Sequence, residues 1–351
     1  MRLPLVGIVV ELKYLSLVLL VFQNVLLVMS ARYSRVNLVD NVPYISSTAV
    51  VMSEALKLVA SLMGEYIWHL PPGESLANRL RAEVWNVDMV KLSVPGILYT
   101  VQNNLLFVAL SNLSVGVYQV SAQLKILTTA VLSVLVLSKK LSWVQWVSLL
   151  ALTGGVALVQ VSTTSGGGSS SEAGNPVVGM LAVLMACVTS GFAGVYFEKL
   201  LKQGRPVSLF MRNFQLAFYG VIIGQGGVLV NDRALVLEGG YFQGYGTPVY
   251  VVIVTQAVGG LLVAVVMRYA DNILKGFATS LSIIVATALS TMFFGTQLTA
   301  MFVMGAVLVL VAVFLYGTYP AIEAPKAQAY APVATSETEM GGRGPSQPQQ
   351  R

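Results

Sequence analysis

Four ionisable residues lie where an apolar chain can least accommodate charge. Glu54, Lys57, Lys125 and Lys275 each fall within a long run of apolar residues. A charge at the centre of a bilayer costs about 2.5–3.5 kcal/mol even on insertion-based scales, so each side chain needs a partner or a polar cavity. Three of the four are lysines, whose amines bind phosphate oxygens. The pattern predicts an anion-binding site within the apolar part of the chain.

Each of these residues also has a structural interpretation. Glu54 and Lys57 are three residues apart and share one helix face, so they could simply neutralise each other during membrane insertion. Lys125 could pair with Glu54 from another helix. Lys275 could extend its amine to the membrane surface, and for Arg212, close to that surface, this is the favoured interpretation.

Polar and aromatic side chains at similar depth support a cavity. Taken singly, each could be a hydrogen bond between helices. Together with the lysines they would suit an anion that carries a flat, hydrogen-bonding group, with amides on a base or sugar edge and tyrosine for stacking. These residues are Gln102, Asn103, Asn104, Tyr118, Gln119, Gln123, Ser190, Tyr196, Asn213 and Gln215.

Other classes of function have weaker support. A cation channel or proton pump needs carboxylates at membrane depth, and only Glu54 lies deep. A membrane-embedded glycosyl-transferring enzyme stays open as an alternative, but the chain has a single histidine, His69, and a single cysteine, Cys187. It shows no metal-binding cluster, nucleophile motif or phosphate-binding loop. We therefore expect a protein that is not an enzyme and needs no metal or cofactor.

The elements that must position these residues are membrane-spanning helices. The chain has 351 residues, of which 56% are hydrophobic and only 10% charged, against about 25% charged in an ordinary soluble domain. A spanning helix needs about 20 apolar residues. Ten such runs can be found, at 12–30, 44–66, 89–110, 114–137, 142–161, 177–201, 207–230, 247–268, 274–294 and 298–318. The sequence predicts an all-α membrane protein with ten transmembrane helices.

The distribution of positive charge predicts the orientation. With both termini in the cytosol, 14 of the 21 Lys and Arg residues lie at or near the cytosolic side, and only Arg32, Arg35 and Arg233 lie on the other side. This satisfies the positive-inside rule. The pI of about 9.3 then reflects topology, and the dispersal of the charge among loops argues against nucleic-acid binding.

A Gly/Ser-rich stretch at 162–176 divides the chain into two groups of five spans, 1–161 and 177–318, followed by a polar tail at 319–351 that we expect to be disordered. Because five is odd, any similarity between the groups must be inverted, as in many secondary transporters. A weak internal similarity agrees: Lys125 and Thr129 recur 150 residues later as Lys275 and Thr279. We expect two inverted five-helix repeats joined by a luminal linker.

Several motifs resemble those of Golgi nucleotide-sugar transporters. They are YTVQNNL (99–105), ALSNL (109–113), YQV (118–120), QLKILTTA (123–130), SGFAGVYFEK (190–199) and YADNILKGFATS (269–280). The resemblance extends from about Leu12 to Gly317. It implies the drug/metabolite transporter fold and the exchange of a cytosolic nucleotide sugar for a luminal nucleoside monophosphate.

The resemblance also implies roles for individual residues. Gln102 and Asn103 resemble base or ribose contacts, Tyr118 resembles a stacking or ribose contact, and Lys125 and Lys275 resemble phosphate contacts. Ser190, Asn213 and Thr279 are further expected pocket residues, and Glu54 and Lys57 match the ion pair of the second span.

Within the family, the similarity is to the branch that carries UDP-galactose, UDP-N-acetylglucosamine and CMP-sialic acid. The run ILKGFATSLSI (273–283) resembles the UDP-sugar members, so the expected activity is exchange of UDP-galactose or UDP-N-acetylglucosamine for UMP. A CMP-sialic acid/CMP antiporter is the alternative. The implied location is the Golgi membrane, with the endoplasmic reticulum as an alternative, and a homodimer is one arrangement to consider. The expected partners are the two nucleotides and the lipid bilayer.

Overall fold

The computed structural model describes residues 2–5, 8–38, 41–70, 73–84, 86–113, 115–164, 175–205, 207–294 and 299–319. These residues belong to one unit, Met1–Ala321. Most of the predicted linker at 162–176 and nearly all of the predicted tail at 319–351 lie outside the described residues.

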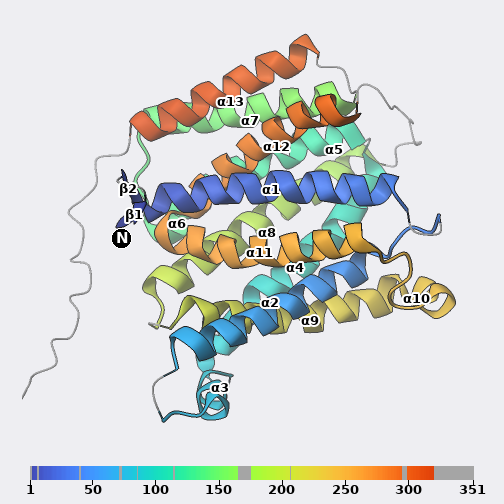
Figure 1. Ribbon diagram of the computed structural model, residues 1–351. Coiled ribbons are helices and arrows are strands. Elements are labelled where there is room, and N and C mark those ends of the chain that lie inside the picture. The colour runs from blue at the N-terminus through green and yellow to red at the C-terminus, as the bar shows by residue number, and fades with distance from the viewer. Residues whose placement is uncertain are drawn as a thin grey trace, which may run out of the picture. The chain divides into compact units, whose positions relative to one another are not determined.

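The described unit consists almost entirely of helices, and in Figure 1 most of the long ones run in roughly the same direction, whereas the short helices α3 and α10 do not. The helices are α1 (Leu12–Val36), α2 (Ser46–Trp68), α3 (Leu76–Val84), α4 (Val87–Asn112), α5 (Val115–Ala122), α6 (Leu124–Leu137), α7 (Trp143–Thr164), α8 (Pro176–Gln203), α9 (Leu209–Asn231), α10 (Arg233–Gly239), α11 (Thr247–Tyr269), α12 (Asn272–Phe294) and α13 (Ala300–Thr318). Two short antiparallel strands, β1 (Arg2–Leu5) and β2 (Ile8–Glu11), precede α1.

The predicted spans are largely confirmed. Among the described residues, nine helical stretches are long and apolar enough to cross a membrane. The remaining predicted span, 89–110, falls within α4, which is 26 residues long and contains Pro95. Helix ends follow ordinary capping chemistry, because Asn175, Ser208 and Thr299 each accept a backbone N–H of the helix that follows.

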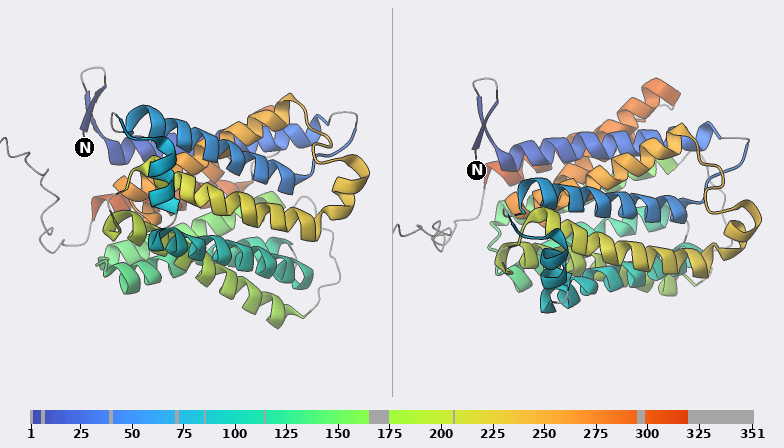
Figure 2. Two further views of the ribbon diagram at one scale, coloured as in Figure 1. Left: turned by 90° about the horizontal axis from the view of Figure 1, so that it is seen from below. Right: turned by 60° about the horizontal axis from the view of Figure 1, so that its bottom comes forward.

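Three features differ from the prediction. The fourth span is broken at Gln123, where α5 ends and α6 begins. The connections hold two short helices, α3 and α10, which have too few apolar residues to give a span signal. In Figure 2, α3 lies at the same end of the helices as the N-terminal strands, and α10 lies at the opposite end.

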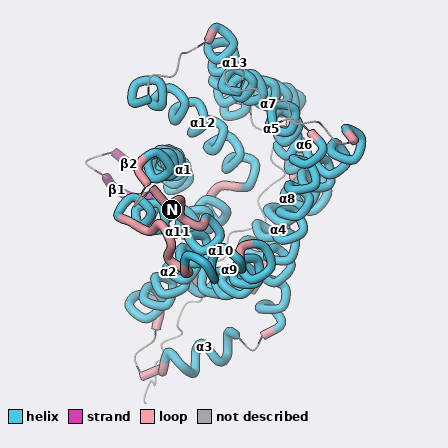
Figure 3. The backbone as a smooth tube through the Cα atoms, turned by 90° about the vertical axis from the view of Figure 1, so that its right-hand side faces the viewer, coloured by secondary structure: helices cyan, strands magenta, loops and turns pink. Residues whose placement is uncertain are grey.

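Helix pairing is compatible with an inverted repeat. If the spans are numbered in order, α4 against α8 becomes α11 against α1 after a shift of five spans, and α6 against α8 becomes α12 against α1; both members of each pair are observed. The pairs α7–α13 and α2–α9 each map onto themselves, and they lie at opposite edges of the end-on view in Figure 3.

The contact between α7 and α13 is a close approach of two backbones. A Cβ atom on Gly155 would lie 2.9 Å from the Gly305 carbonyl oxygen, and one on Gly305 would lie 2.7 Å from the Gly155 carbonyl oxygen. Val309 and Val159 flank the two glycines in the same reciprocal way. These two pairs are again separated by 150 residues. Only glycine leaves room for this contact, which is typical of helix packing in membranes.

We therefore expect Gly155→Ala and Gly305→Ala each to destabilise the protein by about 1–3 kcal/mol, the usual cost of overpacking. The measurement is the apparent melting temperature in detergent. Gly154→Ala is the matched control, because its Cβ would meet only Leu308, at an ordinary 3.9 Å. Equal melting temperatures for Gly154→Ala and Gly155→Ala would contradict the tight contact.

Candidate functional site

Two lysines line one cavity between α6, α8 and α12. The cavity has a volume of about 260 Å³, and Lys125, Lys275, Ser190 and Thr279 are among the residues that line it. Lys125 is exposed although it lies within a membrane-spanning stretch. No Asp or Glu is found among the described residues that line this cavity. Two lysines and no carboxylate among the described lining residues make the cavity suited to an anion.

The helix ends at this cavity add to its positive potential. Because the fourth span breaks at Gln123, α6 begins at Leu124, and Lys125 lies in its first turn. Lys275 lies in the first turn of α12, which begins at Asn272. A helix N-terminus carries about half a positive charge and unpaired N–H groups. Discontinuous helices that point their N-termini at anionic groups are a recurring solution in transporters.

Polar side chains beside the lysines are partly occupied by internal hydrogen bonds. The Thr279 hydroxyl donates to the Lys275 carbonyl oxygen at 3.0 Å. Gln123 Nε2 donates to Gln160 Oε1 at 2.9 Å. Thr279 can therefore donate to a ligand only after its hydroxyl rotates, whereas the two lysines are the cavity's charged donors.

A second cavity lies between α2, α4, α8, α9 and α11. Its volume is about 410 Å³, and Glu54, Lys57 and Asn213 are among its lining residues. Lys57 Nζ lies 2.6 Å from Glu54 Oε2 and 2.8 Å from Glu54 Oε1. Asn213 is 3% exposed and donates to the Leu209 carbonyl oxygen. Both the lysine and the carboxylate of this cavity are thus compensated.

Two glycines make room for this ion pair. A Cβ on Gly220 would lie 2.4 Å from Glu54 Oε2, and one on Gly260 would lie 2.8 Å from Lys57 Cδ. The pair therefore extends from α2 over the bare backbones of α9 and α11. It has the geometry expected of a self-neutralising pair, and it also faces a cavity.

Of the remaining predicted site residues, Gln102 and Tyr118 are not among the described residues that line either cavity. Tyr118 packs against an apolar cluster that contains Ala109, Leu113 and Cys187. Gln102 Oε1 is buried and has no hydrogen-bond partner among the described residues, so this amide is available to a ligand that reaches it. The side chain of Asn103 lies outside the described residues.

The structure places Lys125, Lys275 and Arg212 differently from the structural interpretations that the sequence offered for them. The pairing of Lys125 with Glu54 is wrong, because Glu54 pairs with Lys57 and Lys125 lines the other cavity. Lys275 lines the cavity instead of extending to the surface. Arg212 is only 2% exposed; it donates to the Arg205 carbonyl oxygen after α8 and to Gln215.

Sequence reasoning missed two residues that line the lysine cavity. Asn272 lines it at the start of α12, and Thr129 lines it as the repeat counterpart of Thr279. The 150-residue similarity had already paired Thr129 with Thr279 and could have identified Thr129 as a lining residue. The break at Gln123 has no proline or glycine to mark it.

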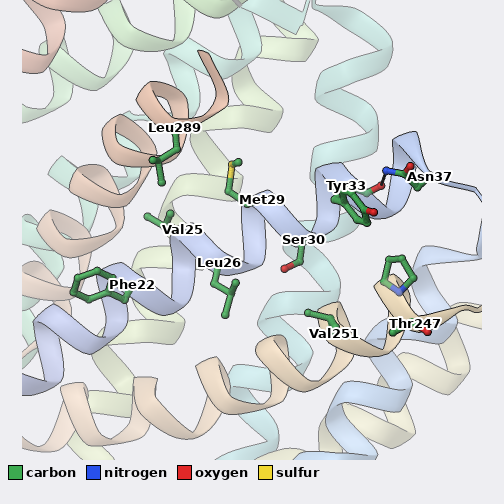
Figure 4. Close-up of a pocket in the computed structure, with 11 residues that line it drawn as sticks. Phe22, Val25, Leu26, Met29, Ser30, Tyr33, Asn37, Thr247, Val251 and Leu289 are labelled. Carbon is green, nitrogen blue, oxygen red and sulfur yellow. Dashed lines mark hydrogen bonds between the residues drawn. The ribbon is translucent and has the colours of Figure 1, made fainter. Parts of the chain in front are cut away.

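A third cavity, of about 940 Å³, lies between α1, α11 and α12. Figure 4 shows Phe22, Leu26 and Val251 in its apolar part, with Tyr33 and Asn37 at the far end of α1. None of the described residues that line it is charged, so it does not suit a phosphate-bearing ligand.

Comparison with known proteins gives consistent results. Residues 9–317 match the sequence model of the nucleotide-sugar transporter family. The chain is 51% identical over 315 residues to the UDP-N-acetylglucosamine transporter of Bos taurus, covering 88% of this chain and 96% of that protein. It is 46% identical over 328 residues to the UDP-galactose translocator of Homo sapiens, covering 92% of this chain and 82% of the relative. A crystal structure at 13% identity aligns with a TM-score of 0.61 over 86% of this chain and 96% of the other, which shows a shared fold.

The two cavities predict opposite effects of removing a lysine. Lys125→Met or Lys275→Met should stabilise the ligand-free protein by about 1 kcal/mol, because each substitution removes repulsion between like charges at a binding site. Lys57→Met should destabilise it by about 1–3 kcal/mol, because Glu54 is left without its cation. The apparent melting temperature without ligand checks both signs. A fall for all three variants would show that Lys125 and Lys275 are structural.

Proposed function

The chain belongs to the nucleotide-sugar transporter family, and from this premise we propose that it exchanges a cytosolic UDP-sugar, UDP-galactose or UDP-N-acetylglucosamine, for luminal UMP in the Golgi membrane. The observation that carries the proposal is the pair of lysines, Lys125 and Lys275, which line one cavity within spanning helices without a carboxylate among its described lining residues. The family and its close relatives are transporters, not enzymes.

The charge of the cavities matches that of both proposed ligands. Lys57, Lys125, Lys275 and Glu54 together carry two positive charges. The diphosphate of a nucleotide sugar carries two negative charges, and a monophosphate such as UMP is nearly doubly ionised above its second pKa, about 6. Each ligand would neutralise the same excess, so exchange of one for the other is close to electroneutral.

The same charges favour exchange over leak. An empty carrier would have to reorient with two uncompensated ammonium groups at membrane depth, which is costly. A bound polyanion removes that cost. We propose that the two five-helix groups rock about the lysine cavity and expose it to each side in turn.

The proposed exchange has a direct test in proteoliposomes. Preloading vesicles with UMP should accelerate uptake of UDP-N-acetylglucosamine or UDP-galactose severalfold over empty vesicles, because the internal ligand allows the return step. Uptake that is indifferent to preloading would contradict exchange. A preference for CMP and CMP-sialic acid in the same assay would indicate the other branch of the family.

Binding should depend on the lysine cavity. We expect Lys125→Ala to reach the membrane and to lose stabilisation by UMP and UDP-sugars, since a charge-assisted contact to phosphate is lost. Lys199→Ala is the control, because Lys199 is an exposed lysine on α8. If nucleotides still raise the melting temperature of Lys125→Ala as in the unaltered chain, Lys125 does not contact phosphate.

A further inference from the structure

One face of α8 contacts both lysine-bearing helices. Ser190, Gly191, Gly194 and Glu198 follow one another at helical spacing and so form one stripe. Ser190 lines the lysine cavity. The next residues of the stripe approach α6 and α12, so α8 is the common support of the two helices whose first turns carry Lys125 and Lys275.

Gly191 is the contact with α6. A Cβ atom there would lie 3.2 Å from the Thr129 backbone nitrogen and 3.1 Å from Leu132 Cδ1. One turn away, the Thr128 hydroxyl donates to the Cys187 carbonyl oxygen at 3.1 Å. The backbone of α6 is therefore packed directly on α8 just after Lys125.

Gly194 is the contact with α12. A Cβ atom there would lie 2.3 Å from Asn272 Nδ2 and 2.9 Å from Asn272 Cγ. Asn272 is only 4% exposed, so its side chain has little freedom to move away. The first residue of α12 thus fills the space that the missing side chain of Gly194 leaves.

Glu198 fixes the same helix end electrostatically. Its carboxylate is fully buried, and Oε2 accepts the Asn272 backbone N–H at 2.9 Å. Glu198 Oε1 lies 2.8 Å from Lys139 Nζ and 2.9 Å from Lys202 Nζ. One carboxylate therefore caps α12 and is held in place by two cations.

Asp271 completes the cluster. Its Oδ1 accepts the Leu274 backbone N–H at 2.7 Å, and its Oδ2 lies 3.3 Å from Lys139 Nζ. Burial would raise the pKa of Asp271, but Lys139, together with the Leu274 N–H and Lys202, holds that pKa below its ordinary value. Asp271 is therefore held as a carboxylate in a cluster that contains two acidic residues and two lysines.

We propose that Gly194 and Glu198 are positioning residues that hold Lys275 in register with Lys125 when the cavity is empty. The two ammonium groups repel each other, and the N-terminus of α12 adds to that repulsion. The notch at Gly194 and the carboxylate of Glu198 oppose it by fastening α12 to the helix that also supports α6. The significance of this register for ligand binding rests on the proposed function.

Cysteine cross-linking tests the register without any ligand. Cys187, the one cysteine in the chain, is first replaced by Ser. Thr129→Cys and Thr279→Cys, each one turn beyond a lysine and lining the same cavity, are then introduced so that both ammonium groups stay in place, and the full-length protein is treated with a short bifunctional thiol reagent. We expect a high yield of intramolecular cross-link, and a clear loss of that yield when Glu198→Gln or Gly194→Ala is added.

The chain offers matched controls for both substitutions. Glu65 is also a buried carboxylate, 1% exposed, that lies 2.6 Å from Arg79 Nε and accepts the hydroxyl of Ser208, the N-cap of α9. Gly226 lies within α9, and a Cβ there would meet nothing within 4 Å. Neither Glu65→Gln nor Gly226→Ala should alter the yield.

A size-compensating variant separates positioning from general damage. Adding Asn272→Ala to Gly194→Ala removes the side chain that the new methyl group would strike, so the cross-link yield should recover. The proposal is overturned if the yield is unchanged by Glu198→Gln and Gly194→Ala, if the controls lower it equally, or if Asn272→Ala fails to restore it. Gly194→Ala decides the outcome alone should Glu198→Gln not fold.

UMP affinity provides the second measurement, made on the chain without the introduced cysteines. Glu198→Gln and Gly194→Ala should weaken UMP binding on the order of tenfold, since a supporting contact that shifts a binding group by a fraction of an ångström has effects of this size. Glu65→Gln should not weaken it. If the unaltered chain binds no nucleotide while the cross-linking behaves as expected, the proposed function fails and the positioning role stands.

Discussion

The structure depends on how a hydrocarbon environment tolerates charge. A lysine within a spanning helix must be neutralised, hydrated or lost, and this chain treats its lysines in two ways. Lys57 has a permanent partner in Glu54, three residues away on the same helix. Lys125 and Lys275 share a cavity whose described lining contains no acid. The first arrangement is neutral in itself, whereas the second leaves two lysines with no carboxylate among the described lining residues.

The two lysines of the second arrangement repel each other, so the helices that carry them need support from residues outside the cavity. The support is α8, which brings glycine backbone to α6 and both a glycine and a buried carboxylate to α12. Two further cations, Lys139 and Lys202, hold that carboxylate in place. Because this cluster of two carboxylates and two lysines is formally neutral, it fixes the start of α12 without cancelling the positive charge of the cavity, whose described lining residues include no acid.

Much of this could be predicted from the sequence, and the limits have physical causes. The membrane spans could be predicted because the bilayer thickness sets the length of apolar sequence that a spanning helix needs. Lys125 and Lys275 stood out because charge is rare there and because they recur at a spacing of 150 residues. The break at Gln123 was missed, since no proline or glycine marks it. The role of Glu198 could not be predicted, because its partners Lys139 and Asn272 are distant in the sequence. Tyr118 packs against an apolar cluster, and its contact with a ligand stays a prediction.

The glycine contact between α7 and α13 bears on how such a molecule can move. Backbone atoms of the two helices approach each other there, so any sliding would drive carbonyl oxygens into neighbouring backbone. At the opposite edge, α2 and α9 meet through side chains such as those of Glu54 and Phe210, which can change rotamer. The α7–α13 contact is therefore rigid and can act as a pivot, whereas the α2–α9 contact can adjust through its side chains. A tilt about the α7–α13 contact displaces groups in proportion to their distance from it, so the largest displacements fall on the side where Glu54 of α2 meets Gly220 of α9.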